Sequence, residues 1–265
     1  MKVGEFLKEA RLALGDRIEA DALLKHVLDV DSAWLIAHSR DELPEESAAA
    51  FRNLLQRRMK GEPVAYILGH REFYGLDFHV NENTLIPRPE TELLVELSLE
   101  RMAERVLDLG TGTGAVAISI AKNAKNSAVT ALDKSPAALE VARENAKKLG
   151  VKVRFLESDW FSAVPGEKFG LIVSNPPYVA EGDPHLKDLA FEPMLALASG
   201  PDGLDSIRII VENAPDHLEP GGWLLFEHGY DQGCACRDLL LAKGFSEVST
   251  WLDLAGIERV SGGRR

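Results

Sequence analysis

An asparagine followed by two prolines and a tyrosine ends an apolar run in the segment IVSNPPYVAEG. The side-chain oxygen of Asn175 and the backbone carbonyl of Pro176 can accept both hydrogens of one planar amino group. The rings of Pro176 and Pro177 fix φ, so these acceptors are held rigidly before a substrate arrives. The ring of Tyr178 can stack on the face of an amide or a base. The pattern is typical of a site that holds an sp² nitrogen, although a rigid turn that only caps a strand would use the same residues.

A second group of candidate residues is the glycine-rich stretch in VLDLGTGTGAVAISIA, which joins an apolar run to a helical one. Glycine permits close approach of the backbone to a ligand, and the N–H groups at a helix start attract carboxylates and phosphates. The spacing departs from the dinucleotide fingerprint G-x-G-x-x-G, because Ala115 stands where the third glycine belongs. The candidate cofactor-binding residues here are Gly110, Thr111, Gly112, Thr113 and Gly114.

Acidic residues follow the next two apolar runs. Asp133, in AVTALDKSP, can accept both hydroxyls of a ribose, while Ser135 before Pro136 is the better helix N-cap. Asp159 can accept from an exocyclic amine, and Trp160 beside it offers an aromatic surface for a purine. A nucleoside with a zwitterionic tail, such as S-adenosylmethionine, satisfies all of these positions. The lack of Lys or Arg beside the glycines favours that ligand over a dinucleotide.

The elements that must position these residues are strands that alternate with helices after Pro89. We expect strands at RVLDL, AVTALD, VKVRFLE, GLIVSN, WLLFEHG, SEVSTWLD and IERVSG, with helices between the first five. This alternation predicts an α/β fold with a Rossmann-like, mostly parallel sheet. The last two strands have no helix between them, which predicts one antiparallel edge strand. Ligands bind at the carboxyl ends of the strands in such folds, where all the candidate residues stand.

The chain changes character at the segment EFYGLDFHVNENTLIPR, whose alternation and turn residues suggest a hairpin. Before it, apolar residues recur three and four apart, which predicts helices. One such helix begins at Pro44 and stops at Gly61, as helix caps require. We therefore expect a small all-helical domain over residues 1–72, a β-hairpin linker over 73–88 and an α/β domain over 89–265.

Composition narrows the class of protein. The 265 residues are 45% hydrophobic and 27% charged, which is ordinary for a soluble globular protein, and the net charge of −12 disfavours nonspecific binding to nucleic acid. Cys234 and Cys236 fall in a helix start, where they would point apart, so neither a disulfide nor a metal site is expected. Glu5 and Glu9 interrupt the apolar pattern of the N-terminus, which argues against a signal peptide, and no apolar run approaches a membrane span. We expect a cytoplasmic protein that makes no contact with a membrane.

In this order, DLGTGTG, ALDKSP, SDWF and NPPY resemble the class I S-adenosylmethionine-dependent methyltransferases that methylate amino groups. More narrowly, PVAYILGHREFYGLDFHV, TLIPRPETELLVE and SNPPYV, behind a small helical domain, resemble the peptide-chain release factor N5-glutamine methyltransferases (PrmC/HemK-like). The resemblance covers nearly the whole chain. NPPY is shared with adenine-N6, cytosine-N4 and guanine-N2 methylases, so it indicates the type of nitrogen and leaves the substrate open.

The resemblance implies that S-adenosylmethionine is the cofactor, bound by the glycine-rich turn, Asp133, Trp160 and Asn175. It also implies that Asn175 to Tyr178 hold a glutamine of the Gly-Gly-Gln (GGQ) loop of class I peptide chain release factors. Asn175 and Pro176 are the expected catalytic residues, because they would orient the nitrogen and stabilise the positive charge that develops on its hydrogens. No His or Lys stands next to NPPY to act as a base, so we expect direct attack, followed by loss of a proton to solvent.

Other assignments stay open at this point. Glu192 and Arg88 are further candidates for lining the site. The helical domain over 1–72 is expected to dock the release factor, the alternative being that it only covers the sheet or the hairpin. An amino-methyltransferase for a nucleic-acid base, of the adenine-N6 type, is the nearest rival activity, and direct binding to DNA is not expected because no basic, aromatic-interleaved segment is present. A non-catalytic binding module is the other rival, against which the intact Asn175 argues.

Overall fold

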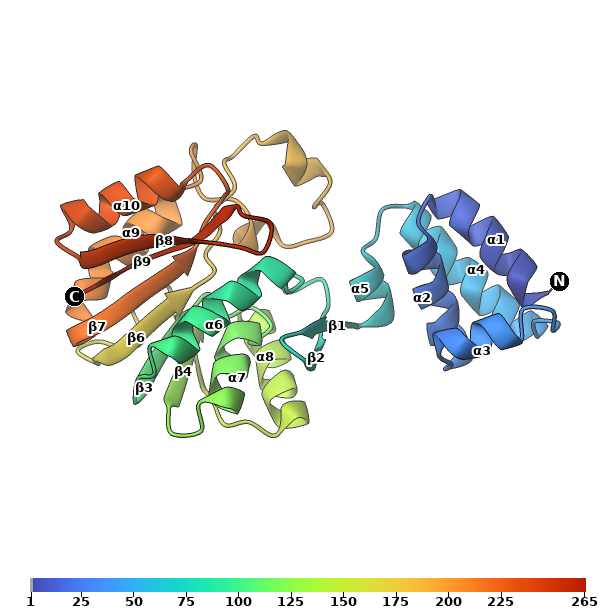
Figure 1. Cartoon of the computed structure of the whole chain (residues 1–265), viewed down its shortest axis with the longest axis horizontal. Coiled ribbons are helices and arrows are strands. Elements are labelled where there is room, and N and C mark those ends of the chain that lie inside the picture. The colour runs from blue at the N-terminus through green and yellow to red at the C-terminus, as the bar shows by residue number, and fades with distance from the viewer. Residues whose placement is uncertain (1) are drawn as a thin grey trace. The chain divides into compact units, whose positions relative to one another are not determined.

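The computed structural model describes residues 2–265, which form two compact units, the first ending at His70 and the second beginning at Arg71 (Figure 1). The first unit is helical. Asp16 and Asp31 begin two of its helices by accepting hydrogen bonds from backbone N–H groups of the first turn, as aspartate N-caps do. Its helices are α1 Val3–Leu14, α2 Arg17–Leu28, α3 Ser32–Ala37, α4 Glu45–Met59 and α5 Val64–Leu68.

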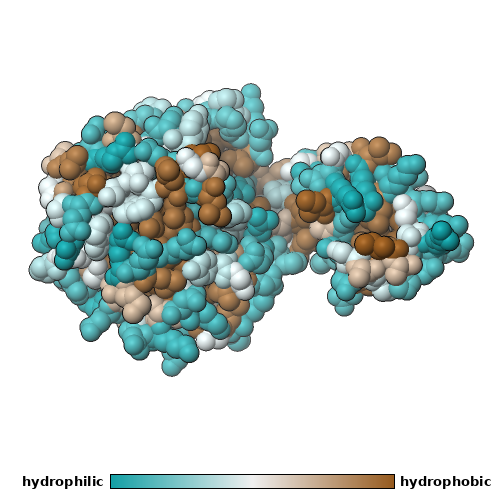
Figure 2. All heavy atoms as spheres, in the orientation of Figure 1, coloured by the Kyte–Doolittle hydropathy of each residue, from teal (hydrophilic) through white to brown (hydrophobic). Residues whose placement is uncertain are grey.

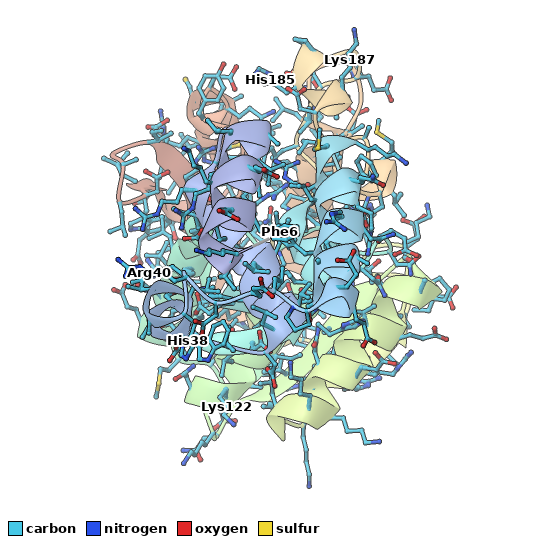
Figure 3. The ribbon with its side chains drawn as sticks, turned by 90° about the vertical axis from the view of Figure 1, so that its right-hand side faces the viewer. Phe6, His38, Arg40, Lys122, His185 and Lys187 are labelled. Atoms are coloured by element: carbon cyan, nitrogen blue, oxygen red, sulfur yellow. The ribbon has the colours of Figure 1, made fainter. Side chains whose placement is uncertain are left out.

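The helical unit has a hydrophobic core of its own. Phe6 of α1 lies between α1 and α4 (Figure 3) and meets Phe51 edge to face, with ring centroids 6.2 Å apart. The guanidinium of Arg52 lies 5.1 Å from the centroid of the Phe6 ring. Leu23 and Leu24 of α2 are fully buried in the same cluster. The unit therefore contains the apolar burial that an independently folding domain needs.

A short hairpin follows the helical unit. Its strands are β1 His70–Phe73 and β2 Leu76–His79, and the turn between them consists of Tyr74 and Gly75, both with positive φ. Two consecutive residues of positive φ match the twist of hairpin strands. The paired strands thus begin earlier and are shorter than the expected hairpin over 73–88, and residues 80–88 form a loop.

The second unit contains a seven-stranded sheet in the order β5-β4-β3-β6-β7-β9-β8. All neighbouring strands from β5 to β7 pair in parallel, whereas β9 pairs antiparallel with both β7 and β8. The expected mostly parallel sheet is confirmed, and its antiparallel strand lies one place in from the edge. The strands are β3 Arg105–Leu109, β4 Ala128–Asp133, β5 Arg154–Glu157, β6 Phe169–Ser174, β7 Leu218–Glu227, β8 Ser246–Leu252 and β9 Glu258–Arg264.

Helices cover both faces of this sheet (Figure 1). Neighbouring residues of β3 point to opposite faces, so Val106 packs in one apolar cluster and Leu107 in the other. The first cluster includes residues of α6 Glu92–Glu100, α7 Ala115–Asn123 and α8 Pro136–Leu149, and the second includes residues of α9 Asp205–Asn213 and α10 Gly233–Ala242. The short 3-10 helix η1 Pro89–Thr91 leads into α6.

The expected helix between the strands VKVRFLE and GLIVSN is absent: β5 and β6 are joined by turns. Trp160 and Gly166 both have positive φ, and Pro165 precedes the glycine, so the backbone of this segment cannot follow a helical path. The segment is also too short for a helix that would cross the sheet. The prediction of helices between all of the first five strands was wrong at this point.

The strand order fixes where a ligand can bind. The chain runs from β3 outward through β4 to β5, then returns beside β3 as β6 and continues the other way to β7. This reversal creates a crevice at the carboxyl ends of β3 and β6. Figure 2 shows hydrophilic residues and separate apolar patches over the visible face of the second unit. Within residues 2–265, no helix combines the length and the apolar character that crossing a membrane requires.

Candidate functional site

A cavity of about 280 Å³ opens at the carboxyl ends of the parallel strands, in the crevice that the strand order creates. Its volume is close to the lower end of the range of about 300–1,000 Å³ that is usual for small-molecule sites. The structure thus brings together residues that follow four different strands. Of the residues predicted from the sequence, those that line the cavity are Gly110, Thr111, Gly112, Thr113, Asp133, Asp159, Trp160, Asn175 and Pro177.

The turn after β3 presents bare backbone to the cavity. Gly110 and Gly112 have φ of +69° and +54°, and no heavy atom lies within 4 Å of the position that a Cβ would take at either residue. Thr111 N–H donates to the carbonyl of Leu132 at 2.9 Å, which ties the turn to the end of β4. A ligand can therefore approach this backbone closely, and a side chain at either glycine would strain the turn.

Gly114 has a different task from the other two glycines. It is outside the cavity lining and stands at the start of α7 with φ of +81°. A Cβ there would lie 2.8 Å from Cδ1 of Ile118 and 3.3 Å from Cβ of Ala142. The missing side chain lets α7 approach α8, and this is a packing role that the glycine spacing alone did not separate from ligand binding.

Asp133 joins the end of β4 to the glycine-rich turn. Its Oδ2 accepts from Gly112 N–H at 2.8 Å and its Oδ1 from Ser135 N–H at 2.9 Å. Burial raises the pKa of this carboxyl, and the backbone donors oppose that shift. Ser135 caps α8 by accepting from Ala138 N–H, as the sequence predicted, so Asp133 is not needed as the cap. Its carboxylate remains directed at the cavity, where hydroxyl groups of a ligand can donate to it.

Asp108 lines the cavity although the sequence analysis gave it no role. It is 2% exposed, and its Oδ2 accepts from the Thr111 hydroxyl at 2.6 Å. The pKa of Asp108 is raised to about 7, mainly by burial and to a smaller extent by the nearby charge of Asp133. The sequence contains a signal for this role, because Asp108 is the one charged residue in the apolar end of RVLDL. A single carboxylate buried in a strand is costly unless it has a partner or a function.

Asp159 and Trp160 form the wall that follows β5. Trp160 has φ of +50°, which is uncommon for a residue with a side chain, and its carbonyl accepts from the Ser158 hydroxyl at 2.6 Å. Asp159 pairs with Lys134 Nζ at 2.9 Å. Lys134 is the one basic residue among the described residues that line the cavity, and it already has an anionic partner inside the protein.

Asn175 follows β6 and lines the cavity with one side-chain atom unsatisfied. Its Nδ2 donates to the Thr91 hydroxyl at 3.1 Å, whereas its Oδ1 is buried with no hydrogen-bond partner. An acceptor buried in this way costs about 1–3 kcal/mol. Asn175 therefore lines the cavity and retains one acceptor that no group of the protein satisfies.

Pro176 and Tyr178 lie outside the cavity lining. The hydroxyl of Tyr178 donates to Oε1 of Glu227 at 3.1 Å, which holds the ring against the end of β7. Glu227 is 1% exposed, and burial raises its pKa to about 7. Burial also raises the pKa of Tyr178. Sequence reasoning placed Tyr178 against the substrate and did not identify Glu227.

Glu192 and Arg88 form an ion pair beside the cavity, but neither residue lines it. Glu192 is 5% exposed; its Oε1 pairs with the Arg88 guanidinium and its Oε2 accepts from Ile86 N–H at 3.0 Å. The pair joins the loop before α6 to the loop after residue 192. Pro193 and Leu195, which follow Glu192, do line the cavity.

The chemistry of the lining suits S-adenosylmethionine. Asp108, Asp133 and Asp159 place three carboxylates around the cavity, with Lys134 as the accompanying cation. Carboxylates favour a cationic ligand and accept from hydroxyl groups, while the open glycine backbone permits close contact. Among the described residues, no group of three or more His, Cys, Asp or Glu side chains could hold a metal ion.

Comparison with known proteins identifies both units. Residues 89–252 match the family model of the methyltransferase small domain, and residues 3–69 match that of the PrmC N-terminal domain. The chain is 50% identical over 256 residues to the release factor glutamine methyltransferase of Xylella fastidiosa (strain Temecula1), covering 94% of this chain and 93% of that protein. It is 42% identical to the release factor glutamine methyltransferase of Escherichia coli (strain K12), covering 98% of this chain and 96% of that protein.

Solved structures show the same fold at lower similarity. A methyltransferase from Pyrococcus furiosus superposes with a TM-score of 0.57 at 22% identity, covering 80% of this chain and 98% of that one. The 16S rRNA N2 G1207 methyltransferase (RsmC) of T. thermophilus, solved with AdoMet and guanosine, superposes with a TM-score of 0.55 at 22% identity, covering 74% of this chain and 49% of that one. These likenesses establish the fold of the second unit.

Proposed function

The chain belongs to the release factor glutamine methyltransferases, and on that premise we propose that it methylates the side-chain amide nitrogen (N5) of a glutamine in a class I peptide chain release factor. S-adenosylmethionine is the cofactor, and it supplies an electrophilic methyl group on a positively charged sulfur. The expected location is the cytoplasm. The observation that carries the substrate assignment is the similarity of nearly the whole chain to release factor glutamine methyltransferases, and the unpaired Oδ1 of Asn175, a residue that lines the cavity, supports an N–H donor as the reacting group.

The proposed cofactor residues act through complementary groups. Asp133 accepts from the ribose hydroxyls, and the backbone of Gly110 and Gly112 approaches the ligand because neither residue has a side chain. Trp160 supplies an apolar surface beside Asp159 for the base. Thr111 and Thr113 complete the turn, and Gly114 keeps the helix behind it close to its neighbour. We add Asp108 to this set, because it lines the cavity and accepts from the hydroxyl of Thr111 in the glycine-rich turn.

The substrate amide is a weak nucleophile, so its orientation matters more than its activation. Asn175 Oδ1 accepts one hydrogen of the amide, and the carbonyl of Pro176 is proposed to accept the other. Both acceptors become more favourable partners as positive charge develops on the nitrogen during methyl transfer. The proton leaves to solvent afterwards. Pro177 fixes the backbone of the loop, and Tyr178 anchors it through Glu227.

The helical unit is proposed to recognise the release factor. A single glutamine side chain offers little surface, so selecting one glutamine in a large protein requires contacts away from the reacting amide. The proposed cofactor residues all belong to the second unit, and the helical unit has a separate core. We assign to the helical unit, residues 1–72 by the sequence boundary, the docking of the partner whose GGQ loop carries the glutamine.

Mass spectrometry of a class I release factor provides the test. The release factor is purified from cells that cannot methylate it and is incubated with S-adenosylmethionine and either the wild-type protein or Asn175→Ala. One added methyl group on the glutamine of the GGQ motif, formed by the wild-type protein and not by the variant, is the expected result.

Parallel incubations with DNA and RNA distinguish the rival activity. Methylation of an adenine N6 or of another base, with the release factor left unmodified, would contradict the proposed substrate. Absence of methylation on all three substrates, with S-adenosylmethionine bound, would instead indicate a binding module.

A further inference from the structure

After the NPPY motif the chain makes a long excursion before it reaches α9 (Figure 1). We call residues 180–199 the excursion segment. It is closed at its base by two backbone hydrogen bonds: Val179 N–H donates to the Leu197 carbonyl at 2.9 Å, and Ser199 N–H donates to the Val179 carbonyl at 2.9 Å. The residue directly after NPPY is therefore paired with the end of the excursion segment.

The first residue of NPPY is tied to a different part of the chain. Nδ2 of Asn175 donates to the hydroxyl of Thr91 at 3.1 Å. Thr91 ends the short helix η1, and its N–H donates to the carbonyl of Arg88 at 3.1 Å. The NPPY motif thus stands between two segments, one that is bonded to its first residue and one that is bonded to the residue after its last.

Glu192 joins these two segments to each other. It is a buried residue of the excursion segment, and both of its carboxylate oxygens have partners before η1. Oε1 pairs with the guanidinium of Arg88, and Oε2 accepts from Ile86 N–H at 3.0 Å. Charge-assisted hydrogen bonds from two donors hold a carboxylate in one position. The ion pair therefore closes a ring of contacts around NPPY.

The segments that Glu192 joins also form two walls of the cavity. The residues on either side of Ile86 line it, and so do residues that directly follow Glu192. These lining residues are Leu85, Pro87, Pro193 and Leu195. Glu192 thus fixes the two walls to each other from a buried position beside the cavity, although it does not line the cavity itself.

We propose that Glu192, through Arg88 and Ile86, is a positioning residue that holds the NPPY loop in the geometry required for methyl transfer. This inference rests on the proposed function, in which Asn175 and Pro176 bind the reacting amide. The prolines fix the backbone within the motif, whereas the ring of contacts fixes the motif relative to the rest of the site. A misplacement of about 1 Å can cost about 10²-fold in rate, so a residue outside the cavity can control turnover.

A purely stabilising ion pair predicts a different result. Its removal would lower the free energy of unfolding and leave the kcat of the folded protein unchanged. Removal of a positioning residue lowers kcat in protein that is still folded. The two roles are therefore distinguished by turnover at saturation together with the mobility of the NPPY loop.

Four variants provide this comparison. Glu192→Ala removes both contacts, whereas Glu192→Gln keeps an acceptor for Ile86 N–H and loses the charge that faces Arg88. Arg88→Ala removes the ion pair from its other side. Glu167→Gln is the matched control, because Glu167 pairs with Arg105 at 2.6 Å and is outside the cavity lining.

In assays with saturating S-adenosylmethionine and unmethylated release factor, kcat should fall at least about tenfold in Glu192→Ala and by a smaller factor in Glu192→Gln. The Kd for S-adenosylmethionine should change less than kcat, and Glu167→Gln should match the wild type. Since Arg88 acts only through Glu192, the double variant Arg88→Ala with Glu192→Ala should lose about as much kcat as Glu192→Ala alone.

Amide hydrogen exchange of the free protein gives a readout that does not depend on activity. The N–H groups of Val179 and Ser199 exchange when the base of the excursion segment opens. In Glu192→Ala both should exchange at least about tenfold faster, while Val173 in β6 should change much less. A general loss of stability would accelerate exchange at Val173 to the same extent. Glu167→Gln should leave the exchange at Val179 and Ser199 unchanged.

Circular dichroism confirms that each variant is folded, and Glu192→Gln serves the same tests if Glu192→Ala does not fold. A wild-type kcat in both Glu192 variants, or wild-type exchange at Val179 and Ser199 in both, would overturn the inference. A wild-type protein that methylates no release factor would refute the proposed function instead. The exchange rates would still show whether Glu192 holds the NPPY loop.

Discussion

Removal of the Asp133 carboxylate should weaken S-adenosylmethionine binding more than any other single change in the proposed cofactor residues. The carboxylate lines the cavity and is proposed to accept from both ribose hydroxyls. A hydrogen bond to a charged group contributes about 1.5–3 kcal/mol. Water can replace part of the loss in an open cavity, so we count one such bond and not two. Since about 1.4 kcal/mol corresponds to a tenfold change, Asp133→Ala should raise the Kd about ten- to a hundredfold.

Two features of the structure sharpen this prediction. Asp133 also holds Gly112 N–H and Ser135 N–H, so the alanine variant loosens the glycine-rich turn as well. Asp133→Asn is the matched variant, because its side-chain oxygen can keep one backbone contact while the charge is lost. Burial raises the pKa of Asp133, so the wild-type affinity should decrease as the pH falls through that pKa, whereas the affinity of Asp133→Asn should stay constant over the same range.

Isothermal titration calorimetry with S-adenosylmethionine measures both effects, and circular dichroism confirms that each variant is folded. A folded Asp133→Ala protein with wild-type affinity would show that the carboxylate does not contact the ligand. A wild-type affinity that rises toward low pH would show that the protonated carboxyl is the binding form, and the assignment of Asp133 as an acceptor would then be wrong.

Three further predictions follow from the same residues. Asn175→Ala should lower kcat by about 10²-fold or more while the Kd for S-adenosylmethionine changes less. Calorimetry measures the Kd and turnover at saturating substrate measures kcat. Loss of S-adenosylmethionine binding with an unchanged kcat would contradict this prediction. Removal of the helical unit before Arg71 should leave S-adenosylmethionine binding nearly intact and greatly reduce kcat/KM for the intact release factor, whereas a short Gly-Gly-Gln peptide should be methylated poorly and equally by both forms. Asp108 stays protonated in the folded protein up to its pKa of about 7, against an ordinary 3.8, so its contribution to stability is lost as the pH rises through that interval. In urea unfolding without ligand, the free energy of unfolding of Asp108→Asn relative to the wild type should be higher at pH about 8 than below pH about 3 by up to about 4 kcal/mol.

The positions of the binding residues were predictable because the strand ends can be recognised in the sequence pattern. The apolar run of β3 stops at a glycine, those of the other parallel strands stop at polar residues, and parallel strands bring these ends to one edge of the sheet. Asp133 could be separated from a helix cap because Ser135 stands two residues later and performs that task. The local pattern was sufficient here, since each residue follows directly from the element that precedes it.

The errors arise where tertiary packing decides between equivalent local patterns. Gly110, Gly112 and Gly114 have the same spacing and all adopt positive φ, but only the first two face open space. The approach of α8 to α7, which the sequence does not describe, determines that Gly114 serves packing. The helix expected between β5 and β6 is absent for a local reason. Pro165 and Gly166 disfavour a helix there, but the regular alternation of strands and helices on either side led to its prediction.

Residues that contact the site residues from distant parts of the sequence were the hardest to predict. Thr91 lies 84 positions from Asn175 in the sequence, and their hydrogen bond exists only because β6 and the start of α6 meet at the crevice. Glu227 ends an apolar strand, as Asp133 does, so the rule that identified Asp133 applies to it equally. It was passed over because its strand follows the four whose ends had already accounted for a ligand. The structure shows that this fifth strand end accepts a hydrogen bond from Tyr178, the last residue of the NPPY motif. A search of every parallel strand end, continued after the ligand is accounted for, would have found it.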